Sequence, residues 1–303
     1  MAGRSSATVV RVGERELSLS NLDKVLYPVT GTTKGEVIQY YAGVAAVMLP
    51  HLAGRCITLK RFPNGVDSSG FFEKRCPKHR PAWVGTFLGP GDREGEIGYC
   101  AFAEPADLVW AANMAAIELH VPMALAEDLD APQILVFDLD PGPQTDIRTC
   151  CEVALWVREV LGAVGLDGWP KTSGSKGLQL YVPLNTPCTH EQAGDFALAV
   201  GQVLEKQHRD RVTTTMAKAV RPGKIFVDWS QNARHKTTIG VYSMRAREHP
   251  TVSTPVTWDE VDACAAGDLE LRFTWDAVLA RLDDVGDLFA PVLTTRQHLP
   301  SPA

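Results

Sequence analysis

The sequence lacks a hydrophobic stretch that could cross a membrane. None of its apolar runs approaches the roughly 20 residues that a transmembrane helix needs. Residues 1–30 also contain no apolar core of the kind that defines a signal peptide. We therefore expect a cytoplasmic protein with no membrane partner.

Cysteine is scarce and unevenly placed. The chain has 7 cysteines, an odd number scattered along its length, whereas a disulfide framework uses an even number in a compact pattern. This distribution favours a reducing compartment. Cys76 and His79 form half of a zinc-binding pattern, but no second Cys/His pair stands at ligand spacing, so zinc is the less favoured interpretation.

The chain also lacks an excess of positive charge. It has 30 lysines and arginines against 36 acidic residues, a formal net charge of −6 at pH 7. This balance disfavours a protein that coats nucleic acid without specificity. It remains compatible with an enzyme whose basic residues gather in one groove.

The residues that are present predict an α+β fold, because strand-like and helix-like segments interleave without a regular βαβ rhythm. No repeat or low-complexity segment interrupts them. We expect a catalytic domain over residues 9–290, two lobes that meet near the acidic, loop-like residues 124–133, and a polar tail at 291–303. The expected helices are 34–49, 108–119, 146–164, 190–208, 259–265 and 275–282. A short hairpin is expected at 10–16, and the expected extended segments are 57–60, 134–139, 169–172, 178–182, 224–228 and 237–245.

The most informative motif is a pair of acids at the end of an apolar strand, Phe137-Asp138-Leu139-Asp140-Pro141. Residues two apart on a strand share a face, so Asp138 and Asp140 are expected side by side. Two adjacent carboxylates repel each other unless a cation lies between them. Paired divalent metals are the usual apparatus of phosphoryl transfer. The alternative is a strand end with two solvated acids.

A third acid, Asp228, ends another apolar strand, Ile225-Phe226-Val227-Asp228. If the two strands are neighbours, the three acids converge. Asp228 is then a metal ligand and an acceptor for the proton of an attacking hydroxyl. The alternative is an ordinary aspartate at a strand end.

Between two further predicted strands lies Ser173-Gly174-Ser175-Lys176-Gly177. Its order does not match a Walker loop, and no helix follows it. Turn amides beside hydroxyls and an ammonium group can still bind a triphosphate. Taken alone, a flexible hairpin turn is the more common explanation.

Several other cationic residues stand near these motifs. His120 is expected at the C-terminal end of the predicted helix 108–119, where a histidine usually interacts with the helix dipole. Arg221 and Lys224 precede the third acid, and Arg245 follows an extended segment. Each of them, considered alone, is more often a surface charge than a ligand.

A phosphate site and a stacking site are predicted in the first third of the chain. Lys24 and Lys34 flank a capping box, Thr33-Lys34-Gly35-Glu36, and a helix N-terminus beside two lysines suits a DNA 5′-phosphate. The adjacent Phe71 and Phe72 cannot both enter one core face, which leaves an aromatic ring for base stacking. Solvated lysines are the alternative for the first pair.

Together these motifs resemble the archaeo-eukaryotic primase superfamily, and specifically the polymerase domain of bacterial ligase D and its stand-alone relatives of the Prim-PolC type. The likeness runs from Asn21-Leu22-Asp23-Lys24-Val25-Leu26-Tyr27-Pro28 to about Pro250. The segments Phe-Asp-Leu-Asp-Pro, Thr-Ser-Gly-Ser-Lys-Gly and Val-Asp-Trp-Ser-Gln-Asn occur in the family's order.

The resemblance implies a fold of two packed lobes of mixed sheet flanked by helices, one of them similar to an RRM. It implies that Asp138, Asp140 and Asp228 bind two divalent cations, Mn²⁺ or Mg²⁺. It further assigns the incoming nucleotide to Lys60, His120, Ser173, Lys176, Arg221, Gln231 and Arg245. Lys24 and Lys34 match the pair that grips the 5′-phosphate across a gap, and Phe71 and Phe72 match aromatics that stack on the template. No role carries over to residues 75–83.

The implied function is a template-dependent primase-polymerase that fills short gaps in 5′-phosphorylated DNA, with NTP preferred over dNTP, at the nucleoid. The chain has no Lys-x-Asp-Gly ligase nucleophile, so a separate ATP-dependent DNA ligase is expected as a partner. The alternative within the same class is an end-joining polymerase of the ligase D type that works with Ku. A metal-dependent nuclease and a non-catalytic DNA-end binder are alternatives from other classes.

Overall fold

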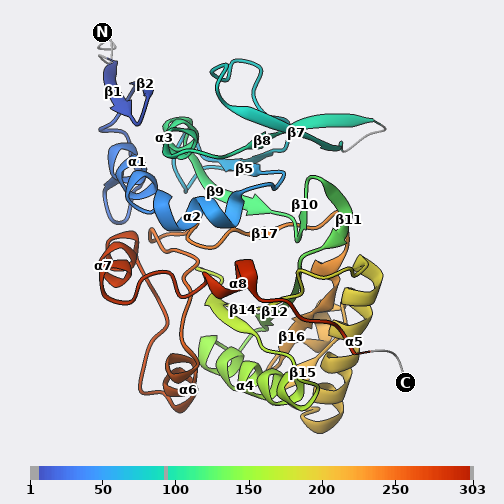
Figure 1. Cartoon of the computed structure of the whole chain (residues 1–303). Coiled ribbons are helices and arrows are strands. Elements are labelled where there is room, and N and C mark those ends of the chain that lie inside the picture. The colour runs from blue at the N-terminus through green and yellow to red at the C-terminus, as the bar shows by residue number, and fades with distance from the viewer. Residues whose placement is uncertain (1–6, 92–94, 301–303) are drawn as a thin grey trace.

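The computed structural model describes residues 7–91 and 95–300, which form two packed lobes built on two different sheets (Figure 1). Each lobe has its own hydrophobic core. The predicted α+β class and the two-lobed arrangement are confirmed. Within the described ranges, no helix combines the length and the hydropathy that crossing a bilayer requires.

The first lobe, in the upper half of Figure 1, contains a four-stranded sheet in the order β17-β9-β5-β6. Its strands are β5 (Thr58–Arg61), β6 (Phe71–Glu73), β9 (Ala116–Val121) and β17 (Thr238–Ile239). Its helices are α1 (Lys34–Gly43), α2 (Ala45–Leu52) and α3 (Pro105–Asn113). Three hairpins complete the lobe: β1–β2 (Thr8–Val12, Arg15–Leu19), β3–β4 (Val25–Tyr27, Thr32–Thr33) and β7–β8 (Gly85–Pro90, Glu96–Ala101).

The capping box predicted at the start of α1 is present. The Thr33 side chain accepts a hydrogen bond from the Glu36 amide, and the Glu36 carboxylate accepts one from the Thr33 amide. The single helix expected over 34–49 is instead two helices, separated at Val44. Pro50 lies inside α2 rather than ending the helix. A proline removes one helical hydrogen bond, and the buried Met48 and Leu52 hold this short helix against the core.

The helix predicted over 108–119 is wrong in its second half. Helix α3 ends at Asn113, and Ala115 adopts a left-handed conformation with φ of 56°. The chain then forms strand β9, so His120 lies on a strand and not at a helix end. The continuous apolar run hid the reversal, because a buried strand and a buried helix have the same composition.

The second lobe contains a five-stranded sheet in the order β13-β14-β12-β16-β15. Its strands are β12 (Ile134–Pro141), β13 (Trp169–Thr172), β14 (Leu178–Pro183), β15 (Val212–Thr213) and β16 (Ile225–Asp228). Its helices are α4 (Ile147–Ala163), α5 (His190–Gln207) and α6 (Trp258–Ala266), with the 3-10 turns η1 (Lys218–Val220) and η2 (Trp229–Asn232). The hairpin β10–β11 (Ala124–Leu125, Asp128–Pro132) precedes β12 in the chain.

Strand β12 contributes to both cores through its alternating side chains. Leu135, Phe137 and Leu139 pack in the second core together with residues of α4 and α5. Ile134 and Val136 pack in the core of the first lobe. Asp138 and Asp140 continue the series of Ile134 and Val136, so they belong to the face of the sheet that is turned toward the first lobe.

The C-terminal quarter of the chain links the two lobes. Helix α7 (Trp275–Val285) and the short helix α8 (Pro291–Thr294) follow α6, and Val278 and Phe289 are buried in the first core. The Gln297 side-chain amide donates to the Pro183 carbonyl oxygen at 2.9 Å, so the polar segment after Pro291 packs on β14. Residues 301–303 of the expected tail lie outside the described residues.

The sequence favoured a reducing compartment over a disulfide framework, yet one pair of cysteines is bonded. Cys76 and Cys100 are bonded to each other, which joins the segment after β6 to strand β8. Cys56, Cys150, Cys151, Cys188 and Cys264 are free and buried. Sequence spacing could not identify the pair, because its two members are 24 residues apart and only the fold brings them together. Because its sulfur is bonded to Cys100, Cys76 cannot serve as the zinc ligand of the Cys76–His79 pattern.

Candidate active site

The three acids predicted from the sequence meet on adjacent strands. Strands β12 and β16 are antiparallel, and their register places Asp138 directly opposite Asp228. Residues opposite each other on such strands have Cβ atoms only about 5 Å apart. Asp140 lies two residues from Asp138 on the same face of β12. The convergence predicted for the three acids is therefore present in the fold.

The electrostatics of the acids indicate a site for cations. Burial, followed by the charges of Asp140 and Asp228, raises the pKa of Asp138 to about 7. Burial and the charge of Asp228 also raise the pKa of Asp140. Among the described residues, no three potential ligands already surround a point at metal-binding distance. Three mutually repelling oxygen donors nonetheless fit a hard divalent cation, which would bring them closer and remove the repulsion.

Neighbouring amides and hydroxyls hold two of the acids in place. The Gln231 Nε2 donates to Asp138 Oδ2 at 3.2 Å. Gln179 lies directly opposite Asp138 on β14, and its side chain lowers the pKa of the Asp138 carboxyl. Asp228 Oδ1 accepts bonds from the Ser230 amide at 3.1 Å and the Ser230 hydroxyl at 2.5 Å. Gln231, which the resemblance places near the nucleotide, therefore lies directly beside an acid.

A buried carboxylate, Glu118, gathers three of the cationic residues. It is 1% exposed and accepts hydrogen bonds from His120 Nε2 at 2.9 Å, Lys60 Nζ at 3.4 Å and Arg245 Nε at 3.3 Å. Burial alone would raise the pKa of Glu118, but the hydrogen bond from His120 and the charges of Arg245 and Lys60 lower it to about 2. A single anion thus orients the three side chains toward one region.

The loop Ser173–Gly177 joins β13 to β14 as predicted, and it is internally bonded. Ser173 Oγ accepts hydrogen bonds from the amides of Ser175 and Gly177. Arg245 Nη1 donates to the Ser173 carbonyl oxygen at 2.8 Å, which ties the loop to the Glu118 cluster. Gly174 has φ of +65°, and a Cβ there would lie 2.7 Å from the Ser253 amide nitrogen and the Arg245 side chain. Only glycine fits this position.

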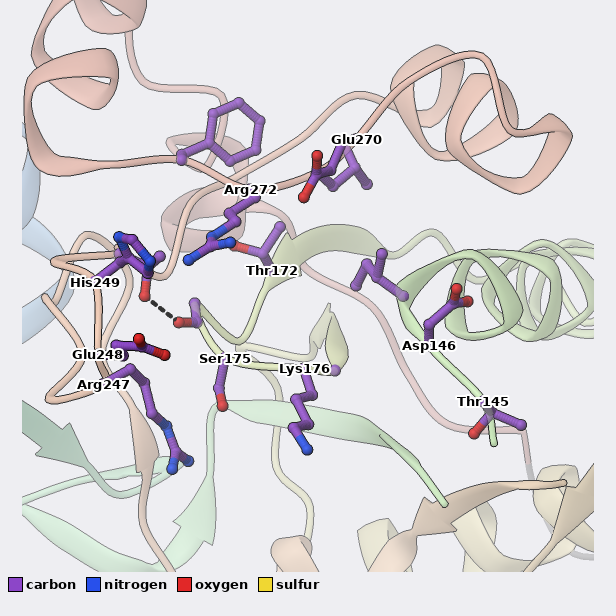
Figure 2. Close-up of a pocket in the computed structure, with 16 residues that line it drawn as sticks. Thr145, Asp146, Thr172, Ser175, Lys176, Arg247, Glu248, His249, Glu270 and Arg272 are labelled. Atoms are coloured by element: carbon purple, nitrogen blue, oxygen red, sulfur yellow. Dashed lines mark hydrogen bonds between the residues drawn. The ribbon is translucent and has the colours of Figure 1, made fainter. Parts of the chain in front are cut away.

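A cavity of about 530 Å³ adjoins this loop (Figure 2). The loop borders it together with residues 145–147, 247–249, 251 and 270–273. The Lys176 and Arg247 side chains extend toward the same side of the view, away from Arg272. The hydrogen bond from the Thr251 hydroxyl to the Gly174 carbonyl oxygen holds the loop at one edge. Lys176 is thus at the cavity wall, on the loop that the sequence predicted to bind a triphosphate.

Arg221 lies near the acids on the turn that precedes β16. Its guanidinium carbon is 3.6 Å from the centre of the Phe226 ring, and its Nη2 donates to the Met216 carbonyl oxygen at 2.7 Å. Its positive charge opposes the rise in the pKa of Asp140. Arg221 is therefore part of the same electrostatic site as the three acids.

The two lysines predicted to hold a phosphate lie side by side at the first helix. Lys34 is the first residue of α1, and its amide donates to the Lys24 carbonyl oxygen at 2.8 Å. Lys34 Nζ donates to the Ser20 carbonyl oxygen at 2.5 Å, and Lys24 Nζ donates to the Pro63 carbonyl oxygen at 2.6 Å. Burial and the charge of Lys24 lower the pKa of Lys34 to about 8. The negative charge of an anion bound here would raise this pKa again.

Both aromatic residues of β6 are exposed, Phe71 at 44% and Phe72 at 56%. The Phe72 ring contacts His120 edge-on, with centroids 5.3 Å apart, and Lys60 Nζ is 5.3 Å from the same ring. The Arg61 guanidinium lies over Phe71. An exposed aromatic pair thus adjoins the Glu118 cluster, where bases could stack.

Sequence reasoning missed three buried polar residues of this site: Glu118, Lys171 and Gln179. Glu118 had a signal, because Glu118 and His120 alternate with Ile117 and Leu119 as they do in a strand. The helix prediction concealed that alternation. Gln179 and Lys171 gave no sequence signal, because their importance depends on strand pairing around Asp138.

Comparisons with known proteins identify the family of this chain. The family model described as "LigD, primase-polymerase domain" matches residues 33–289. The multifunctional non-homologous end joining protein LigD of Mycolicibacterium smegmatis is 47% identical over 90% of this chain, and the bifunctional LigD of Bacillus subtilis is 32% identical over 89%. The chain spans only 36% and 43% of the lengths of these two relatives.

A solved structure is similar over nearly the whole fold. It is the polymerase domain from Mycobacterium tuberculosis ligase D in complex with DNA, at a TM-score of 0.85 and 44% sequence identity. The match covers 93% of this chain and 99% of that one. The two-lobed fold is thus the fold of a domain that has been seen bound to DNA.

Proposed function

Since the chain belongs to the LigD primase-polymerase domain family, a family of metal-dependent nucleotidyltransferases, we propose that it fills short gaps in DNA that carry a 5′-phosphate, with ribonucleotides as preferred substrates. The proposed catalytic domain comprises residues 9–290, followed by the tail 291–303. The observation that carries the proposal is the register that sets Asp138 opposite Asp228, with Asp140 on the same face.

Asp138, Asp140 and Asp228 would hold two divalent cations, Mn²⁺ or Mg²⁺, which when bound neutralise the charge that develops during phosphoryl transfer. Asp228 would also accept the proton of the attacking 3′-hydroxyl. Its bonds to Ser230 fix its orientation for that step.

The triphosphate would bind the loop of Ser173 and Lys176 together with Arg245, which is already bonded to that loop. Lys60 and His120 would contact the remainder of the nucleotide from their positions on Glu118. Gln231 and Arg221 would act beside the acids. A nuclease needs clustered acids but no such triphosphate set, so this arrangement favours a polymerase over a nuclease.

The DNA would be held at two further places. Lys24 and Lys34 would bind the 5′-phosphate at the far side of a gap, because their two ammonium groups match its two charges. Phe71 and Phe72 would stack on the template strand. A non-catalytic DNA-end binder would need the lysines but not the three acids.

A separate ATP-dependent DNA ligase would then seal the filled gap. The relatives are named as non-homologous end joining proteins, which supports a second candidate, an end-joining polymerase that works with Ku. Both candidates use the same active site, and both place the protein in the cytoplasm at the nucleoid.

Primer extension tests the proposal. The purified protein is incubated with gapped, 5′-phosphorylated DNA and each of the four NTPs and dNTPs, with Mn²⁺, with Mg²⁺, or with a chelator. We expect templated addition that requires a divalent cation. Degradation of the primer, or binding without extension under every condition, would contradict the proposal.

A further inference from the structure

A fully buried lysine lies behind the acids. Lys171 on β13 is 0% exposed, and its Nζ lies 2.6 Å from Gln179 Oε1, 2.7 Å from Ser253 Oγ and 3.2 Å from the Ile239 carbonyl oxygen. An unpaired buried ammonium group is very costly, whereas this one has three acceptors for its three protons. Nothing in the nucleotide, DNA or metal assignments uses this side chain.

The neighbours of Lys171 fix the direction of each hydrogen bond. The Ile239 carbonyl can only accept. The Ser253 hydroxyl proton is given to the Thr172 carbonyl oxygen at 2.8 Å, so Ser253 Oγ accepts from the lysine. The third ammonium proton then goes to Gln179 Oε1. The Gln179 carbonyl oxygen therefore faces Lys171.

The orientation of Gln179 decides which of its groups faces Asp138. Gln179 on β14 is directly opposite Asp138 on β12. With the Gln179 oxygen engaged by Lys171, its NH₂ group is the one left to face Asp138, and it lowers the pKa of the Asp138 carboxyl. A glutamine that was free to flip could instead present its oxygen to Asp138 and repel it. The ammonium group prevents this.

We propose that Lys171 is a positioning residue for the metal site: acting through Gln179, it holds the Asp138 carboxylate in the orientation in which it binds a divalent cation. This inference rests on the proposed function, because it takes Asp138 to be a cation ligand. Residues that orient a metal ligand affect metal affinity without touching the metal, commonly by about tenfold or more. Gln231 holds the other side of the same carboxylate.

Mn²⁺ binding to the isolated protein tests this, measured by isothermal titration calorimetry or by the electron paramagnetic resonance signal of free Mn²⁺. Lys171→Met keeps an unbranched side chain of nearly the same length and removes the ammonium group. Gln179→Leu removes the connection. Each variant should bind Mn²⁺ about tenfold more weakly than wild type, and the double variant should be no weaker than either single one. Exposed Lys206 on α5 provides a matched control, Lys206→Met, which should bind like wild type.

If Lys171 serves only the stability of the fold, the variants that fold should bind Mn²⁺ as wild type does. Folding is checked by thermal denaturation, and if Lys171→Met does not fold, Gln179→Leu alone decides. Full Mn²⁺ affinity in either folded variant, or additive losses in the double variant, would overturn the inference. Wild-type protein that neither binds Mn²⁺ nor extends primers would instead overturn the proposed function, so the two failures are distinguishable.

Discussion

Asp138 and Asp228 lie directly opposite each other on antiparallel strands β12 and β16. Like charges in this position destabilise a sheet, and burial together with the neighbouring acids raises the pKa of Asp138 to about 7. The fold therefore tolerates an unfavourable arrangement at this point. Such conflicts are typical of functional sites, where a ligand removes them.

The first prediction concerns this repulsion in protein freed of metal by a chelator. Because the pKa of Asp138 is raised in the folded state, its ionisation lowers the free energy of unfolding. This loss increases from pH 4 to about pH 7 and is constant at higher pH. At pH 8, the free energy of unfolding of Asp138→Asn should therefore exceed that of wild type by on the order of 1–4 kcal/mol. Urea denaturation measures this difference. The difference should vanish near pH 4. Adding Mn²⁺ should stabilise wild type but not the variant.

The second prediction concerns Glu118. Replacing it by glutamine removes the charge that orients Lys60, His120 and Arg245. We expect Glu118→Gln to raise the KM for the nucleotide by about tenfold or more, while Mn²⁺ affinity stays at the wild-type value. The control is Glu205→Gln on α5, which leaves this cluster intact. An unchanged nucleotide KM in folded Glu118→Gln would show that the cluster is not part of the nucleotide site.

The third prediction concerns the phosphate site. Gapped DNA with a 5′-phosphate should bind more tightly than the same DNA with a 5′-hydroxyl, and Lys24→Ala combined with Lys34→Ala should erase the difference. Each lysine contributes on the order of 1 kcal/mol, less at high salt. Binding titrations with both DNA ends decide the question. A preference that survives in the double variant places the phosphate site elsewhere.

The same site should depend on pH. The pKa of Lys34 is lowered to about 8, so its ammonium group is charged at pH 7 and loses its proton as the pH rises through that value. The preference for a 5′-phosphate should therefore be strongest near pH 7 and decline between pH 8 and 9.5. Lys34→Arg, which stays charged throughout, should keep the preference at high pH. A preference that declines equally in both proteins would exclude Lys34 as its cause.

The fourth prediction concerns the sugar of the nucleotide. We expect ribonucleotides to be incorporated with a higher kcat/KM than deoxyribonucleotides, on the likeness to the family alone. Single-nucleotide addition opposite one template base, with NTP and dNTP compared at equal Mn²⁺, measures this. Equal or reversed values would show that the likeness does not extend to sugar selection.

Local sequence patterns predicted the strands that carry the acids, because side-chain alternation and apolar composition both indicate a β-strand before Asp138 and before Asp228. They also predicted the loop at Ser173 and the capping box at Thr33. They failed where the decisive contacts are non-local. Glu118 contacts Lys60 because β9 pairs with β5, and it contacts Arg245, which is 127 residues away in the sequence.

The errors have the same origin. The predicted helix before His120 rests on a mostly apolar run, and the reversal at Ala115 depends on one left-handed residue. The disulfide between Cys76 and Cys100 depends on how β8 lies beside the segment after β6. Neither is encoded in the local period of the sequence.

The central claim is that Asp138, Asp140 and Asp228 form a centre for nucleotidyl transfer, and one measurement tests it most directly. Nucleotide addition to gapped, 5′-phosphorylated DNA is compared between wild type, Asp138→Ala and Asp228→Ala, with DNA binding measured in parallel. We predict that both variants bind the DNA as wild type does and add no nucleotide, because the charge of the transition state is no longer neutralised. Substantial extension by either variant would remove that acid from the catalytic role and contradict the account.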